Sequence, residues 1–134
     1  MKKFALDTNT ISYLLKEDLA VSNRLRAESD GGNGLVIPLI VYYEVKRGLL
    51  AVDASRKTQL FEQFCNVLGV DDMSFSVLDK AAHIYDDLRR IGRLIEDADI
   101  IIAAFCLVND CILVTNNTKH FSHIEGLQLV NWME

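Results

Sequence analysis

Four polar side chains in this 134-residue chain have the types and the setting for metal-assisted chemistry on a phosphate: Asp7, Glu44, Asp99 and Asn116. Each lies beside or within an apolar stretch, so each is expected at the margin of a core, where a carboxylate needs a partner, a hydrogen bond or a metal. Carboxylates gathered in one cleft repel each other, and a divalent cation relieves that repulsion. Oxygen ligands without a cluster of cysteine and histidine favour Mg²⁺ or Mn²⁺ over Zn²⁺. A Mg²⁺ ion held in this way keeps waters, accepts phosphate oxygens and activates a water for in-line attack on a phosphodiester.

Each of these residues also has an ordinary structural interpretation. Asp7 and Asp99 could cap helices, Glu44 could be a solvated helix residue, and Asn116 could belong to a turn. Gly48, one helical turn after Glu44, is a poor helix former, and it predicts a close backbone approach on that face. The hypothesis of a phosphate-processing site therefore depends on whether the fold brings the four side chains together.

Alternating strands and helices must position these side chains. Buried strands are predicted over residues 3–6, 35–37 and 111–115, with a weaker strand or extended link over 70–75 and a last short strand near 127–131. Helices are predicted over about 11–15, 19–27, 39–50, 54–68, 77–91 and 97–108, and residues 28–34 form the clearest loop. This order predicts one α/β domain with a central, mainly parallel sheet flanked by helices on both faces. In such a sheet, ligands bind at the edge where the strands have their carboxyl ends.

Two of the helices carry more detailed predictions. Ser76 and Asp79 have the spacing of a capping pair at the start of the helix over 77–91. The helix over 54–68 is expected to bury a stripe of apolar side chains, formed by Leu60, Phe61, Phe64, Val67 and Leu68.

Composition limits the class of protein. Hydrophobic residues make up 50% of the chain, which excludes a disordered protein. No apolar run reaches the roughly 18 to 20 residues of a membrane span, and the run after Met1–Lys3 is too short for a signal peptide. The three cysteines have no CxxC spacing, which we interpret as reduced thiols in a cytoplasmic protein. The net charge of −5 disfavours a broad basic nucleic-acid footprint, but it is compatible with an acidic site that engages phosphates through a metal.

Four short motifs, in order along almost the whole chain, resemble those of PIN-domain ribonucleases, specifically the small VapC-type toxins of type II toxin–antitoxin pairs. Phe4–Asn9 is similar to the family's apolar strand that ends in D-T-N, and Glu44–Gly48 is similar to its E-x-x-x-G helix. Asp99–Ala104 looks like its D-x-x-I-A-A helix. The closing segment of the family is matched by Leu113–Asn117, Phe121, Gly126, Leu127 and Trp132. Each motif is weak alone, but four in order at suitable spacing are specific.

The resemblance implies a PIN-like three-layer fold, with residues 1–134 as a single domain, and a Mg²⁺-dependent endoribonuclease, Mn²⁺ being the other candidate ion. It implies that Asp7, Glu44 and Asp99 hold the metal and that Asn116 joins them in the catalytic site. It also implies RNA as the substrate, with tRNA among the candidates, and a cognate VapB-type antitoxin as a partner. A homodimer, or a higher toxin–antitoxin assembly, is the implied oligomeric state.

The acidic stretch that opens the helix over 97–108 holds three carboxylates with different expected roles. Asp99 leads the family-like motif and lines up with Ile102 and Cys106 at helical spacing, so it is expected to point inward to the metal. Asp97 is expected to cap the helix, and Glu96 is expected to be solvated.

Several polar residues near these motifs are candidates for contacts with RNA. They are Asn9, Lys46, Arg47, Arg89, Arg90, Arg93, Thr115 and Lys119. For each cation taken singly, an ordinary surface position is an equally good interpretation.

His120 departs from the family pattern, because many relatives carry Asp or Glu just before the phenylalanine at position 121. The missing negative charge predicts one firm metal site, with any second metal weak or brought by the substrate. His120 and His123 form an HxxH, which we interpret as two unrelated surface histidines. Two alternatives stay open: a PIN-fold module that binds RNA or protein with impaired catalysis, and a phosphatase-like phosphoryl-transfer protein. The second alternative requires an aspartate where Asn9 stands.

Overall fold

The computed structural model of the protein describes all of its residues, 1–134. Strands and helices alternate along the chain as β1 (Lys3–Leu6), α1 (Thr8–Leu15), α2 (Leu19–Asp30), β2 (Gly34–Pro38), α3 (Leu39–Val52), α4 (Ser55–Leu68), β3 (Val70–Asp71), α5 (Phe75–Arg90), α6 (Asp97–Val108), β4 (Ile112–Val114), a 3-10 helix η1 (Thr118–Phe121) and β5 (Leu129–Val130). The predicted α/β class is confirmed. No helix has both the length and the apolar character that crossing a membrane requires.

The five strands form one parallel sheet in the order β3-β2-β1-β4-β5. The chain first winds outward from β1 through β2 to β3, and it then returns to place β4 on the other side of β1. The ends of β1 and β4 therefore flank the point where the winding direction reverses, which is where open parallel sheets bind ligands. Asp7 directly follows β1, and Thr115 directly follows β4.

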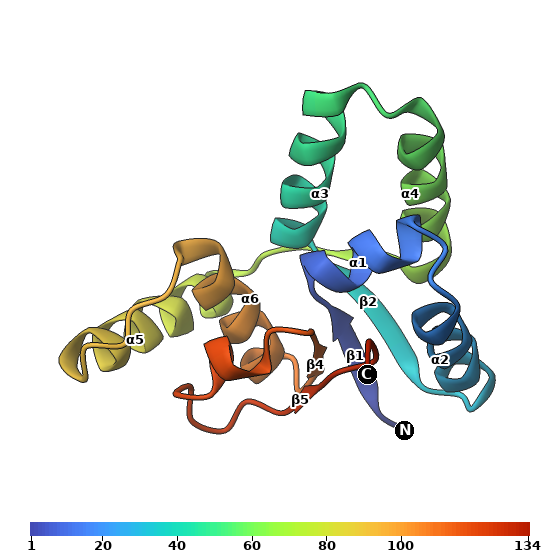
Figure 1. Cartoon of the computed structure of the whole chain (residues 1–134). Coiled ribbons are helices and arrows are strands. Elements are labelled where there is room, and N and C mark those ends of the chain that lie inside the picture. Colours follow the sequence, from blue (N-terminus) through green and yellow to red (C-terminus); the bar gives the residue numbers. More distant parts are fainter.

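Helices cover both faces of the sheet. Right-handed crossovers place the helices between β1 and β3 on one face and those between β3 and β4 on the other. Figure 1 shows this division, with α1 to α4 grouped together and α5 beside α6 on the opposite side. Helix α3 contacts α1, α4 and α6, so it stands next to the carboxyl ends of the central strands. The predicted three-layer arrangement is confirmed.

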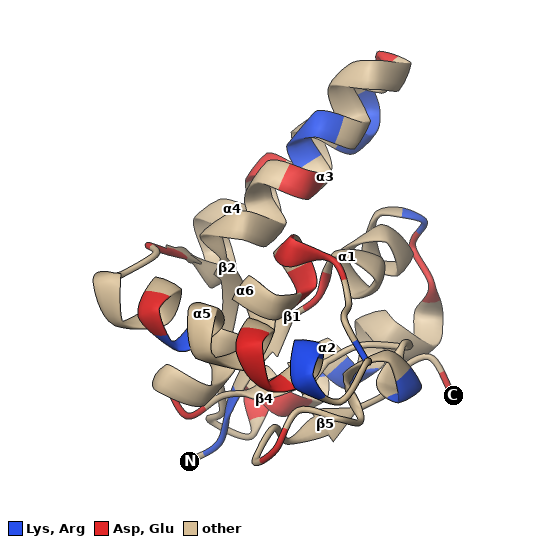
Figure 2. Ribbon diagram, turned by 90° about the vertical axis from the view of Figure 1, so that its left-hand side faces the viewer, with Lys and Arg blue, Asp and Glu red and all other residues tan.

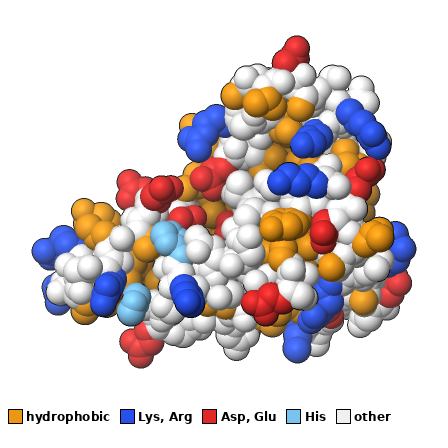
Figure 3. All heavy atoms as spheres, in the orientation of Figure 1, with side chains coloured by type: hydrophobic (Ala, Val, Ile, Leu, Met, Phe, Trp, Pro, Cys, Tyr) orange, Lys and Arg blue, Asp and Glu red, His pale blue; other side chains and the backbone are white.

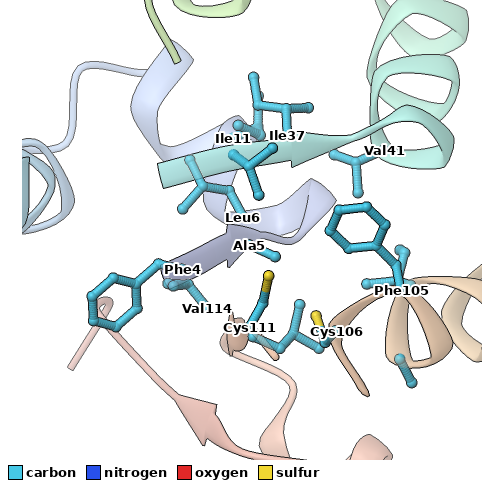
Figure 4. Close-up of a cluster of buried hydrophobic side chains, with 14 of the residues drawn as sticks. Phe4, Ala5, Leu6, Ile11, Ile37, Val41, Phe105, Cys106, Cys111 and Val114 are labelled. Atoms are coloured by element: carbon cyan, nitrogen blue, oxygen red, sulfur yellow. The ribbon is translucent and has the colours of Figure 1, made fainter. Parts of the chain in front are cut away.

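Buried hydrophobic side chains form one contiguous cluster that joins the two helical layers through the sheet. Phe4, Ala5 and Leu6 of β1 lie at its centre, each at most 2% exposed. Figure 4 shows this core, with Phe105 of α6 reaching toward Val41 of α3. Helix α6 is apolar around most of its circumference, because it is enclosed by the sheet, α3 and α5. The acidic first turn of α6 is therefore held in place by a helix that is locked into the core.

The start of α5 differs from the prediction. The N-cap is Ser74, whose Oγ accepts a hydrogen bond from the backbone N–H of Val77 at 3.2 Å. The predicted capping pair, Ser76 and Asp79, is wrong, since both residues lie within the helix. Phe75 is 86% exposed and lies in the first turn of α5, instead of in the predicted strand or extended link over 70–75.

Other boundaries and burial predictions also need correction. Helix α2 continues to Asp30 and β2 begins at Gly34, so the predicted loop over 28–34 shrinks to a tight turn. Val67 is 82% exposed, although it was predicted to lie in the apolar stripe of α4. At 100° per residue, Val67 lies roughly 240° around the helix from the buried Phe61, which places it on the solvent side.

Gly48 does not mark a close backbone approach. A Cβ atom built at this position meets no atom within 4 Å, and the residue is exposed. The prediction was wrong because a glycine within a helix is consistent with either a neighbour that is too close or a space that is left open, and only packing distinguishes the two.

Candidate active site

The end of β1 is tied to the end of β4 through Asp7. The backbone N–H of Asp7 donates to the carbonyl of Val114 at 3.0 Å, and the side chain caps α1. Its Oδ1 accepts from the N–H of Thr8 at 2.8 Å. Its Oδ2 accepts from the hydroxyl of Thr115 at 2.8 Å and from the amide of Asn9 at 3.1 Å. Asp7 is therefore a cap, as its ordinary interpretation predicted, and also a carboxylate held rigidly at the switch point of the sheet.

Burial has the largest effect on the pKa of Asp7, which is 3% exposed. Removal from water raises the pKa of this carboxyl, and the negative charge of Asp99 raises it further. The hydrogen bonds from Thr115, Thr8 and Asn9 lower the pKa but do not offset the burial. Each carboxylate oxygen has two lone pairs, and Oδ1 of Asp7 uses only one of them within the protein. One acceptor position on this buried carboxylate is therefore available to a cation.

Glu44 reaches the same region from α3. Its Oε1 accepts a hydrogen bond from the hydroxyl of Thr8 at 2.9 Å, and its Oε2 lies 4.0 Å from a guanidinium nitrogen of Arg47. The side chain is 16% exposed. Glu44 is thus not an ordinary solvated helix residue, because its carboxylate is turned toward α1 and is linked to the residue that follows Asp7.

Asp99 enters from the first turn of α6. Its Oδ2 lies 2.8 Å from Nε2 of His120, which belongs to η1, and its side chain is 22% exposed. Burial raises the pKa of Asp99, and the charges of Glu44 and Glu96 raise it further, while the contact with His120 lowers it. Asp99 is therefore near enough to Asp7 to raise its pKa, and Glu44 is near enough to Asp99 to do the same.

The expected cap of α6 needs correction. Glu96 occupies the N-cap position without a side-chain hydrogen bond, and Asp97 is the first helical residue. Asp97 and Asp99 both lie in the first turn, where carboxylates are favoured by the positive end of the helix dipole. Asp97 is exposed, so only Asp99 is turned toward the other carboxylates.

The two polar residues after β4 contact the site in different ways, one through its side chain and the other through its backbone. Thr115 is fully buried and bonds Asp7 directly. Asn9 links the two strand ends, because its amide donates to both Asp7 and Thr115 while its oxygen accepts from the backbone N–H of Asn116 at 3.1 Å. Asn116 itself is exposed, and it joins this network through its backbone. Asn9 and Thr115 thus organise the carboxylate of Asp7.

The donor chemistry of the site suits a hard divalent cation. The available groups are carboxylate oxygens, and two of the carboxyls carry raised pKa values, as expected for anions that are buried beside each other. No three side chains of His, Cys, Asp or Glu lie close enough together to enclose a metal ion. Mg²⁺ is commonly held by only one or two carboxylates and otherwise by water and substrate phosphates, so the residues fit an open site of that kind.

The cations predicted to contact RNA fall into two groups. On α3, Lys46 pairs with Glu62 at 3.4 Å, and Arg47 lies 5.1 Å from the ring centre of Tyr43. Figure 2 shows these basic bands on α3, beyond the acidic band nearer the sheet.

The second group lies around the end of α5 and on η1. Arg89 and Arg90 both pair with Asp86, at 2.8 and 2.9 Å. Arg93 and Lys119 are exposed and form no ion pair. The fold therefore places Lys46 and Arg47 on the helix that carries Glu44, and Lys119 beside His120.

Three contacts of the site were not predicted from the sequence. Thr8 donates to Glu44, Thr10 is fully buried and donates to the carbonyl of Val114 at 2.7 Å, and His120 contacts Asp99. The polar run directly after a buried strand was a usable signal for Thr8 and Thr10. No local pattern predicted the contact of His120, because that histidine and Asp99 belong to different elements.

Residues 4–127 match the model of the PIN domain family. The chain belongs to the PIN-domain family. Among PIN-domain relatives of similar length, Ribonuclease VapC1 from Haemophilus influenzae (strain R2866) is 29% identical over 96% of this chain and 97% of the relative. The tRNA(fMet)-specific endonuclease VapC of Shigella flexneri is 27% identical over 98% of this chain and 99% of the relative.

The PIN fold is also seen in similar solved structures. A chain of VapBC2 from Rickettsia felis, in a crystal structure bound to a DNA fragment from its promoter, superposes with a TM-score of 0.90. It is 27% identical, and the match covers 96% of this chain and 98% of that one. The similarity thus extends over the whole PIN domain, including the elements that carry Asp7, Glu44 and Asp99.

Proposed function

We propose that this protein is a VapC-type toxin, a divalent-metal-dependent endoribonuclease that hydrolyses phosphodiester bonds in RNA. The observation that carries the proposal is the buried carboxylate of Asp7 at the switch point of a PIN-domain sheet, with the charge of Asp99 raising its pKa and the charge of Glu44 raising the pKa of Asp99. Relatives over nearly the full length are named as ribonucleases, and one is named as a tRNA(fMet)-specific endonuclease. A tRNA is accordingly one candidate substrate.

Asp7 and Asp99 are the residues that we expect to hold the metal, with Glu44 beside them. The ion supplies Lewis-acid polarisation of the phosphodiester and lowers the pKa of a bound water. The remaining residues position the ligands. Thr115 and Asn9 fix the orientation of Asp7, and Thr8 fixes that of Glu44 through its hydroxyl.

The raised pKa values support this assignment. Burial and the charges of neighbouring carboxylates leave Asp7 and Asp99 poorly stabilised as anions, so a divalent cation gains binding free energy by relieving a repulsion already present in the fold. Asn116 contributes no negative charge, and we expect it to contact a metal-bound water or the substrate through its exposed amide.

The two alternatives are weaker. A phosphatase-like activity would need a second aspartate two residues after Asp7. Asn9 stands at that position, and its side-chain amide donates hydrogen bonds to Asp7 and Thr115. A binding module with impaired catalysis is favoured by one observation, the contact of His120 with Asp99, which occupies one oxygen of the carboxylate. The second oxygen of Asp99 accepts no hydrogen bond within the protein, so the contact leaves it available to a metal.

Assembly and location form part of the same proposal. We expect residues 1–134 to act as one domain, to form a homodimer, and to be neutralised by a VapB-type antitoxin, since similar solved structures are VapBC complexes. The three thiols are unpaired, which is compatible with the cytoplasm.

Cleavage assays with antitoxin-free protein test the proposal. RNA should be cut with Mg²⁺ or Mn²⁺ and left intact with EDTA, and Asp7→Asn should remove the activity. Sequencing of RNA ends in cells after induction, with an Asp99→Asn strain as the control, would identify the target. Robust cleavage in EDTA, or full activity of Asp7→Asn, would refute a metal-dependent site at these residues. RNA binding without cleavage of any RNA would favour the binding module.

A further inference from the structure

A hollow of about 280 Å³ adjoins the acidic site on the side of Glu44. Its lining includes Thr8 and Glu44 of the candidate site together with Lys16 and Lys57. The hollow is thus lined both by residues of the candidate active site and by two cations that the sequence did not single out.

The two lysines come from elements far apart in the chain. Lys16 caps the end of α1, and Lys57 lies in the first turn of α4. Both are exposed, and neither lies within ion-pair distance of a carboxylate, whereas the nearby cations Lys46 and Arg56 are paired with Glu62 and Glu17. The ammonium of Lys16 lies over the ring of Tyr13, 5.8 Å from its centre. In a chain of net charge −5, these are two unneutralised positive charges facing one hollow.

Space for a ligand is maintained along this route. Gly48 lines the hollow, and a Cβ atom built at this glycine would meet no other atom within 4 Å. A second hollow, of about 300 Å³, shares Leu15, Lys16 and Lys57 with the first. It adds Leu60 and the ion pair of Arg56 with Glu17, so Lys16 and Lys57 are its cations without an ion-pair partner. The two hollows therefore form a track that leads from Glu44 past both lysines. Figure 3 shows blue side chains gathered on this face, where the pair of helices α3 and α4 meets the rest of the molecule.

We propose that Lys16 and Lys57 form a subsite for a backbone phosphate of single-stranded RNA, next to the phosphate that is cut. The inference rests on the proposed function, because an RNA strand with one phosphate at the carboxylates must place its neighbouring phosphates in adjoining hollows. Lysine ammonium groups act as mobile point charges, which suits a phosphate without imposing a base sequence. An acidic peptide could also contact two lysines, but it would meet repulsion from Glu44 in the same hollow, without a metal-bound phosphate to anchor it.

RNA binding, measured separately from cleavage, tests the subsite. The probe is a fluorescein-labelled single-stranded RNA, and binding is followed by anisotropy in an Asp99→Asn background, which prevents cleavage. Lys16→Gln combined with Lys57→Gln should weaken binding about tenfold at 0.15 M salt and reduce the salt slope of log K by about 0.7, the value for one lost phosphate contact on a single strand. Lys2→Gln combined with Lys80→Gln is the control, since it removes the same charge from exposed positions away from the hollow.

Equal weakening in the two double variants would overturn the inference, because net charge alone would then explain it. Unchanged RNA affinity together with weaker binding of a fluorescein-labelled polyglutamate peptide would overturn it in favour of an acidic-peptide site. RNA cleavage is measured separately, in proteins that keep Asp99. If the protein cuts RNA and the two lysine substitutions leave RNA binding unchanged, the proposed function stands and the subsite is refuted. If only the Lys16 and Lys57 substitutions weaken RNA binding, but the protein with Asp99 cuts no RNA, the subsite is supported and the proposed nuclease activity is refuted.

Discussion

Asp99 and Asp97 provide a matched pair of substitutions within one helical turn. Asp99 is partly buried between Glu44 and His120, and burial raises its pKa, whereas Asp97 is exposed at the first position of α6. Asp99→Asn keeps the shape of the side chain and an oxygen that can accept from His120, but it removes the charge that a metal requires. Asp97→Asn removes the same charge from a position that faces solvent.

The expected size of the effect follows from ligand linkage. A metal at one hundred times its Kd stabilises the native state by about 2.7 kcal/mol. For a chain of 134 residues, this corresponds to a rise in Tm of roughly 10 °C. Asp99→Asn should lose nearly all of that rise. Asp97→Asn should retain it and should cost at most about 1 kcal/mol, the value of a first-turn carboxylate beside the helix dipole.

Thermal unfolding of the three proteins, with EDTA and with a Mn²⁺ titration, measures these differences. RNA cleavage is followed in parallel and should be lost only in Asp99→Asn. A Tm rise with Mn²⁺ that is the same in Asp99→Asn and in the wild type would refute the assignment of Asp99 as a ligand. Loss of the rise in Asp97→Asn would show that the wrong carboxylate of the acidic turn has been chosen.

Three further outcomes test the surroundings of the site. Burial raises the pKa of Asp7, so the native state holds this proton more tightly than the unfolded chain does, and the free energy of unfolding of the metal-free protein should fall as pH rises from 3.8, the ordinary value, through the raised pKa. Urea unfolding between about pH 4 and 7 should show a smaller fall in Asp7→Asn, and an equally steep fall would contradict this account. Thr115→Val removes the hydroxyl that donates to Asp7 at 2.8 Å in a fully buried position, and it should lower the free energy of unfolding by about 1–3 kcal/mol, with Thr115→Ser as a milder control. Gly48→Ala should raise the free energy of unfolding by up to about 1 kcal/mol, because the helix gains a better former in open space, and a loss of stability would reveal a contact at that position.

The sequence by itself determined the fold class and the edge of the sheet at which chemistry is expected. Strand β1 and helix α6 were predicted with the bounds that the structure has, because a short buried run such as Phe4–Leu6 and a long apolar helix behind an acidic turn are decided by local hydrophobic patterning. Since parallel strands share one carboxyl edge, Asp7 and Thr115 were predictable neighbours, and a 2.8 Å hydrogen bond joins them. The PIN-domain resemblance rested on these same local motifs.

Only the tertiary structure decided which side chains face each other across elements. The hydrogen bond from Thr8 to Glu44, the contact of His120 with Asp99, and the unpaired lysines beside Glu44 all join segments that are distant in the chain. Periodicity says which face of a helix is buried, but the position of that helix relative to its neighbours depends on how whole layers pack. For the same reason, Gly48 was assigned a close neighbour where the structure has open space. Residue types therefore pointed to a carboxylate site, and packing decided the orientation of each carboxylate and the route along which a substrate can reach it.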